Sequence, residues 1–149
     1  MALVVALRTS IEIAAPVARV WDVLTDFSAF PRWNPFIRGI DGVLAERARL
    51  QVKIQPPGGR AMTFRPTVLR VEPERLFSWR GRTLLPGLFD GEHSFALEPG
   101  APDHVCFVHG EVFRGLLVPF LAHTLRTTTR EGFEQMNRAL KARAEGVRG

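Results

Sequence analysis

The hydrophobic period of this chain changes repeatedly, and the order of these changes constrains the fold more than any single motif. Residues 3–13 alternate apolar and polar, residues 16–27 carry apolar side chains at helical spacing, residues 37–113 form strand-like runs, and the stretch after Gly115 is helical. A sheet and a long helix both bury their apolar faces when the sheet curves around the helix. The sequence therefore predicts an α+β fold, in which a curved antiparallel sheet wraps around a long C-terminal helix, with two short helices after the first strand. At 149 residues, we expect one domain spanning residues 1–149.

The strand-like runs of residues 37–113 are short and are separated by residues that favour turns. The runs are "IRGIDGVL", "RLQVKI", "MTFRPTVLRV", "RLFSWRGR", "EHSFAL" and "HVCFVHGEVF". Their close spacing favours antiparallel hairpins in a meander.

The closing helix is predicted over residues 117–141. Its inward side is apolar or small, and consists of Leu117, Leu121, Leu125, Thr128, Gly132, Met136 and Leu140. Threonine and glycine are poor helix formers, so packing against the rest of the domain must hold this helix. We expect Gly132 and the threonines to leave space for an internal cavity.

Composition excludes several classes of site. The net charge is +5, but the basic residues are scattered, which argues against a nucleic-acid partner. Cys106 is the single cysteine, so an intramolecular disulfide and a cysteine-based zinc site are excluded, and we expect a buried, inert thiol. No apolar run approaches the ~20 residues of a membrane span. We expect a cytoplasmic protein without cofactor or metal, as a monomer or weak homodimer.

The stretch "IEIAAPVARVWDVLTDFSAFPRWNPFI", the pair "HSFAL" and "HGEVFRGLL", and the closing helix together resemble the START/Bet v 1-like (SRPBCC) superfamily, in its polyketide cyclase/dehydrase-like branch. The resemblance implies a helix-grip fold with a cavity between the sheet and the long helix, usually for a hydrophobic ligand. It does not fix an activity, because the superfamily includes lipid carriers, hormone receptors and cyclases.

One strand carries polar residues on a face that should be buried. In "HVCFVHGEVF", His109 and Glu111 share the parity of two phenylalanines, and His93 shares the parity of its own apolar neighbours on the preceding strand. In a regular hairpin His93, His109 and Glu111 meet on the cavity side. Three interpretations are open: a structural polar cluster, an anchor for a ligand, or acid–base catalysis by these three residues. A metal site is not expected, because nothing fixes a facial ligand geometry.

The predicted ligand-binding residues come from the inward faces of the strands, the closing helix and one loop. They are Trp33, Leu50, Val52, Ile54, Trp79, Leu85, Leu88, Phe89, His93, Phe95, Phe107, His109, Glu111, Phe113, Leu121, Leu125, Thr128 and Gly132. Trp33 has an alternative role as the anchor of the second short helix, and Trp79 as core filling. We expect a cavity within the usual range of roughly 300–1,000 Å³.

The loop "TLLPGLFDG" is too apolar for a solvated turn, because it contains Leu84, Leu85, Leu88 and Phe89. The resemblance places this hairpin tip near the cavity mouth, which favours a gate over the cavity. A dimer contact, a peripheral membrane contact aided by Arg82, and ordinary packing are the alternatives.

Three functions therefore compete. The leading one is binding of a small hydrophobic molecule, such as a lipid, polyketide or aromatic metabolite. The second is a cyclase or dehydratase that uses His/Glu acid–base chemistry in the same cavity, and the third is an interaction module without a ligand. The sequence has no nucleophile elbow, phosphate-binding glycine loop or metal signature, which favours binding over catalysis.

Overall fold

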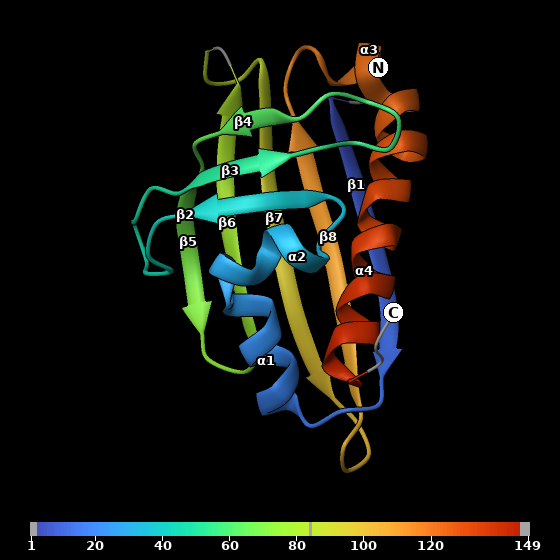
Figure 1. Ribbon diagram of the computed structural model, residues 1–149. Coiled ribbons are helices and arrows are strands. Elements are labelled where there is room, and N and C mark those ends of the chain that lie inside the picture. Colours follow the sequence, from blue (N-terminus) through green and yellow to red (C-terminus); the bar gives the residue numbers. More distant parts are fainter. Residues whose placement is uncertain (1–2, 84, 147–149) are drawn as a thin grey trace.

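The expected order of elements is present in the computed structural model, which describes residues 3–83 and 85–146 (Figure 1). The first half contains β1 (Val4–Ile13), α1 (Val17–Thr25), η1 (Phe27–Ala29), α2 (Phe30–Trp33), β2 (Ile37–Asp41), β3 (Gln51–Ile54) and β4 (Met62–Phe64). The second half contains β5 (Thr67–Glu72), β6 (Leu76–Thr83), β7 (Phe89–Pro99), β8 (Val105–Arg114), α3 (Val118–Thr124), η2 (Leu125–Thr129) and α4 (Arg130–Ala144). The α+β class and the helix-grip architecture are confirmed.

The main sheet is antiparallel and curved, with five strands in the order β1-β8-β7-β6-β5. Its first strand pairs with its last, so that Val5 lies opposite Phe113 and Thr9 opposite His109. The inward parity predicted for the first strand holds, because Val5, Thr9 and Ile13 are buried.

The remaining strands do not continue this meander. β2, β3 and β4 form a separate antiparallel sheet, and Figure 1 shows these strands crossing in front of the long strands of the main sheet. The run "MTFRPTVLRV" was expected as one strand, but it is divided between the two sheets at Arg65 and Pro66. Proline has no N–H to donate to a ladder, so it interrupts the pairing there.

The long C-terminal helix runs from Val118 to Ala144 and packs along β1 and β8 (Figure 1). Its middle segment, η2, is a π-helix that contains the three consecutive threonines. Such π-helical turns are uncommon and are often found at functional sites. No described helix combines the length and the apolarity that crossing a membrane requires.

Gly132 does not leave the open space that the sequence predicted. The ring of Phe36 lies against it, so closely that a Cβ atom at this position would overlap the ring. Phe36 in turn packs edge-on against Phe133, with ring centroids 5.5 Å apart. The small residue in the helix thus accommodates an aromatic side chain from the segment before β2.

Candidate functional site

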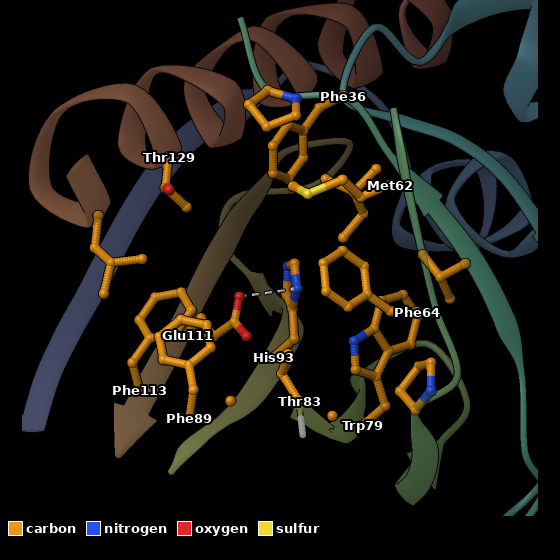
Figure 2. A pocket seen from close by; sticks show the side chains of 17 residues that line it. Phe36, Met62, Phe64, Trp79, Thr83, Phe89, His93, Glu111, Phe113 and Thr129 are labelled. Carbon is orange, nitrogen blue, oxygen red and sulfur yellow. Dashed lines mark ion pairs between the residues drawn. The ribbon is translucent and has the colours of Figure 1, made fainter. Parts of the chain in front are cut away.

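A cavity of about 190 Å³ lies between the main sheet, the three-stranded sheet and the π-helical segment (Figure 2). Its lining consists of Phe36, Val52, Ile54, Pro56, Met62, Phe64, Pro66, Trp79, Gly81, Thr83, Phe89, Gly91, His93, Glu111, Phe113, Leu125 and Thr129. The volume is below the expected range because aromatic rings fill much of the interior. Phe36 occupies the space beside Gly132, and Phe133 stacks on His109 with ring centroids 4.1 Å apart.

The lining is mainly apolar and rich in aromatic rings. Phe89 and Phe113 stack with centroids 5.6 Å apart at one side, and Trp79 stands at another (Figure 2). Met62 is 48% exposed, so the cavity reaches solvent beside β4. Among the described lining residues none is lysine or arginine, and Glu111 and His93 are the polar groups at the centre of Figure 2.

Glu111 and His93 face each other because β7 and β8 pair in regular register, with the two residues directly opposite. His93 Nδ1 lies 3.3 Å from Glu111 Oε1, but this approach does not have hydrogen-bond geometry. Glycine at position 91 makes room for the carboxyl group, since a Cβ atom there would overlap Glu111 Oε2. Glu111 is therefore seated in a recess of the cavity wall.

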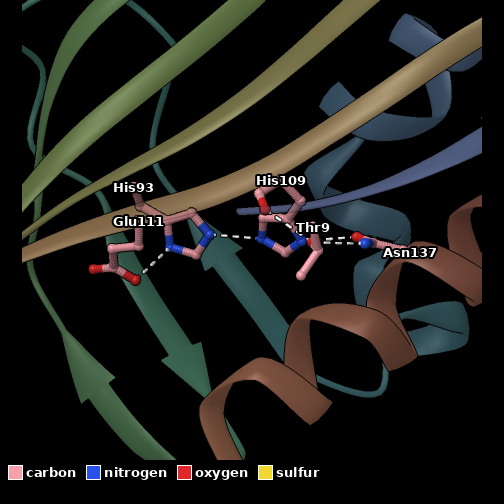
Figure 3. Close-up of polar contacts among 5 residues, drawn as sticks. All are labelled: Thr9, His93, His109, Glu111 and Asn137. Carbon is pink, nitrogen blue, oxygen red and sulfur yellow. Dashed lines mark hydrogen bonds and ion pairs between the residues drawn. The ribbon is translucent and has the colours of Figure 1, made fainter. Parts of the chain in front are cut away.

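A chain of polar contacts continues from His93 into the core (Figure 3). The Nε2 atoms of His93 and His109 are 2.7 Å apart, and His109 Nδ1 lies 2.9 Å from Asn137 Oδ1. Asn137 Nδ2 donates to Thr9 Oγ1 at 2.8 Å, and the Thr9 hydroxyl donates to the His109 carbonyl oxygen at 2.8 Å. The chain thereby connects the cavity to β1 and to α4.

Burial keeps the ionisable side chains in this series of polar contacts, His93, His109 and Glu111, uncharged near neutral pH. Loss of hydration lowers the pKa of His109 to about 4 and the pKa of His93 well below its ordinary value. The same effect raises the pKa of Glu111 to about 8. Desolvation disfavours the charged form of each group, so it shifts bases down and acids up.

The sequence-predicted binding residues divide into two groups. Those that line the cavity are Val52, Ile54, Trp79, Phe89, His93, Glu111, Phe113 and Leu125. Those that lie outside its lining are Trp33, Leu50, Leu85, Leu88, Phe95, Phe107, His109, Leu121, Thr128 and Gly132.

The residues outside the lining have other surroundings. Leu50 and Phe107 are buried in the core, and Phe95 stacks beneath His93 with centroids 4.4 Å apart. Trp33 packs edge-on against Phe30 of the same short helix and is half-buried against the core, and its role as an anchor for α2 stays a prediction. Leu121 is exposed and Thr128 is half-buried.

Several site residues were missed by sequence reasoning. Met62 and Phe64 alternate on β4 and line the cavity, which period-two patterning could have indicated had the break at Pro66 been recognised. Asn137 lies four residues after Phe133 and three before Leu140 on the buried side of α4. A polar residue at that helical spacing was the available signal for a buried partner.

The loop between β6 and β7 was predicted to act as a gate. Leu84 lies outside the described residues, Leu85 is 68% exposed, and Phe89 lines the cavity. The Leu116 and Leu117 amides donate to the carbonyl oxygens of Gly87 and Leu88, at 3.1 and 3.0 Å. These bonds join the loop to the beginning of the long helix, and opening of the loop stays a prediction.

The other reactive side chains of the described residues do not form a metal site or a reactive thiol. Within residues 3–83 and 85–146, no three His, Cys, Asp or Glu side chains come together in an arrangement that could hold a metal ion. Cys106 is half-buried and not fully buried as expected, because its side chain lies on the less covered face of β8. Desolvation and the neighbouring Glu12 raise the pKa of its thiol, which disfavours the reactive thiolate.

Comparison with known proteins places the chain in a family. The sequence profile described as "Polyketide cyclase / dehydrase and lipid transport" matches residues 4–145. The chain belongs to this family. No curated protein matches the chain.

Solved structures of similar fold agree with this assignment. A START superfamily protein from Mycobacterium smegmatis has a TM-score of 0.74 at 23% identity, with 96% of this chain and 99% of that chain covered. The Zhui aromatase/cyclase from a Streptomyces species has a TM-score of 0.74 at 14% identity, with 95% and 94% covered. The di-domain aromatase/cyclase StfQ of the steffimycin biosynthetic pathway has a TM-score of 0.75 at 18% identity, with 96% of this chain covered. This chain covers 52% of StfQ, and at these identities the likeness shows the fold alone.

Proposed function

We propose that this family member binds a small, largely apolar molecule in the cavity between its two sheets and the long helix. The observation that carries the proposal is the lining itself, in which aromatic and aliphatic side chains surround one recessed carboxyl group and one imidazole. Ligand sites usually combine an apolar wall with a few placed polar groups that fix orientation. Burial of the ligand's apolar surface would supply most of the affinity, at about 25 cal/mol per Å² before ordering costs.

The cavity volume narrows the size of this ligand. At about 190 Å³ the cavity is slightly larger than the ~150 Å³ apolar cavity that holds benzene in another protein. The enclosed part therefore suits a body of one or two rings or a short acyl segment. A longer lipid or polyketide would extend past Met62 into solvent.

Acid–base catalysis in the same cavity is a second candidate, and the state of Glu111 favours it. With a pKa near 8, this carboxyl group is protonated at neutral pH and able to donate a proton to a bound carbonyl compound. The aromatase/cyclases of similar fold make a cyclisation or dehydration the reaction class to test. Turnover that is lost in Glu111→Gln while binding is retained would support this candidate.

Blocking the cavity tests binding. Gly81 lines the cavity and has no atom within 4 Å of the position of an added Cβ, so the side chain of Gly81→Leu should enter the cavity without a clash at its Cβ atom. We expect the uncharged two-ring dye acdan to bind wild type saturably, with a blue-shifted emission, and to bind Gly81→Leu at least tenfold more weakly. Gly39→Leu is the matched control, because Gly39 on β2 has equally open space and lies outside this cavity. Equal dye binding by all three proteins would refute the proposal.

A further inference from the structure

The hydrogen bonds of the polar chain behind the cavity follow one donor-to-acceptor order, and Thr9, at the end farthest from the cavity, determines this order. The Thr9 hydroxyl has a single proton, which it donates to the carbonyl oxygen of His109. The hydroxyl oxygen is then an acceptor for Asn137 Nδ2. The amide of Asn137 is thereby oriented with Oδ1 toward His109, so His109 Nδ1 must carry a proton and donate it.

The protonation of His109 in turn determines which nitrogen of His93 is protonated. Burial keeps His109 neutral at physiological pH, so a proton on Nδ1 leaves a lone pair on Nε2. The 2.7 Å contact between the two Nε2 atoms is a hydrogen bond only if His93 Nε2 carries the proton. A neutral His93 therefore has its lone pair on Nδ1, at the cavity wall.

Within residues 3–83 and 85–146 this lone pair has no hydrogen-bond partner, and Glu111 Oε1 lies 3.3 Å from it without hydrogen-bond geometry. His93 is 1% exposed and lines the cavity, and its Nδ1 atom makes no hydrogen bond to any atom of residues 3–83 and 85–146. A buried acceptor without a donor is unfavourable, and such groups in native structures usually meet a ligand or water. Beside it, the recessed carboxyl group of Glu111 presents Oε2 above Gly91.

We propose that the ligand of this cavity is a neutral molecule with a hydroxyl group, which donates a hydrogen bond to His93 Nδ1 and accepts one from the carboxyl group of Glu111. Thr9 and Asn137 act as positioning residues, because they set which nitrogen of His93 is the acceptor. The inference rests on the proposed function and names the ligand class for the same site.

Other ligand chemistries fit the site less well. An ether or a ketone has no proton for His93 Nδ1. A carboxylate would have no cationic partner, since none of the described lining residues is lysine or arginine. An ammonium ion would require Glu111 to give up its proton in an apolar recess.

Matched probes of one ring test the proposal by calorimetric or NMR titration. We expect p-cresol to bind at least tenfold more tightly than 4-methylanisole, in which a methyl group replaces the hydroxyl proton. Equal affinities, or acdan binding without p-cresol binding, would overturn the hydroxyl inference and leave the proposed function standing. Tighter binding of benzylammonium than of p-cresol would also overturn it. Absence of binding by acdan and by every one-ring probe would remove the proposed function as well.

The positioning role has its own test. In Thr9→Val the Asn137 amide is free to turn, so we expect the affinity ratio of p-cresol to 4-methylanisole to fall toward one, while 4-methylanisole affinity changes less than twofold. Thr9→Ser keeps the hydroxyl and should retain the ratio. Nitrogen-15 NMR of wild-type imidazoles should find His109 protonated on Nδ1 and His93 on Nε2. The opposite tautomers would overturn the inference whether or not the variants fold.

Discussion

Glu111 is an acid that the fold holds in its protonated form. The carboxyl group lies in an apolar recess opposite a neutral imidazole, and burial raises its pKa to about 8. The two histidines are held neutral by the same loss of hydration. An interior with three titratable groups is therefore compatible with folding because none of the three needs to be charged at neutral pH.

The pH dependence of stability should reveal this state of Glu111. Between pH 4.5, the ordinary pKa of a glutamate, and pH 8, the folded protein retains a proton that the unfolded chain has lost. The contribution of Glu111 to the free energy of unfolding is thus largest below pH 4.5 and declines as pH rises toward 8, by at most about 1.4 kcal/mol per pH unit.

Glu111→Gln removes this titration, so the stability difference between wild type and variant should shift in favour of the variant from pH 5 to pH 8. The measurement is urea unfolding at several pH values. Glu98→Gln, at an exposed position, is the control that should show no such shift. A pH-independent difference between wild type and Glu111→Gln would contradict the assignment of a protonated acid in this recess.

At the scale of elements, the contact between α4 and the segment before β2 limits the size of the cavity. Gly132 allows the helix and the Phe36 ring to approach closely, and Phe36 forms part of the cavity wall. The glycine is thus required for packing, although alanine would be the better helix former by about 1 kcal/mol.

We expect Gly132→Ala to destabilise the protein by roughly 1–3 kcal/mol, because the added methyl group overpacks against Phe36. Thermal or urea unfolding measures the effect. Phe36→Leu in the same chain should recover part of the loss, since it removes the ring that the methyl group overlaps. Stabilisation by Gly132→Ala alone would show that the helix and the Phe36 ring are not in close contact.

The elements also show which features of the fold the sequence could predict and which it could not. Strand parity is a local property, so it predicted the inward face of β1 and the facing positions of His93 and Glu111. The separate β2–β4 sheet was not predicted, because a single proline at position 66 divides a run that otherwise has the composition of one strand. The contact of His109 with Asn137 depends on the rotation of α4 against the sheet, which no local pattern encodes.

At the scale of the whole molecule, two sheets and one long helix form a small apolar cavity, and the titratable groups of its described lining, His93 and Glu111, come from the β7–β8 hairpin of the main sheet. The family sets the general architecture, and the fold is shared with aromatase/cyclases and a START protein. Within this architecture, the side chains of this protein determine the cavity lining, in which a recessed neutral acid lies beside an imidazole acceptor. The ligand class that we propose follows from these side chains and from the direction of their hydrogen bonds.

A crystal structure of the protein soaked with p-cresol tests this account most directly. We predict that the ring lies between Trp79 and the stacked pair Phe89 and Phe113. The hydroxyl oxygen should lie about 2.7–3.0 Å from His93 Nδ1 and within hydrogen-bond distance of Glu111. A cavity without bound p-cresol at saturating concentration, or a bound ring with its hydroxyl turned toward Met62 and solvent, would contradict the account.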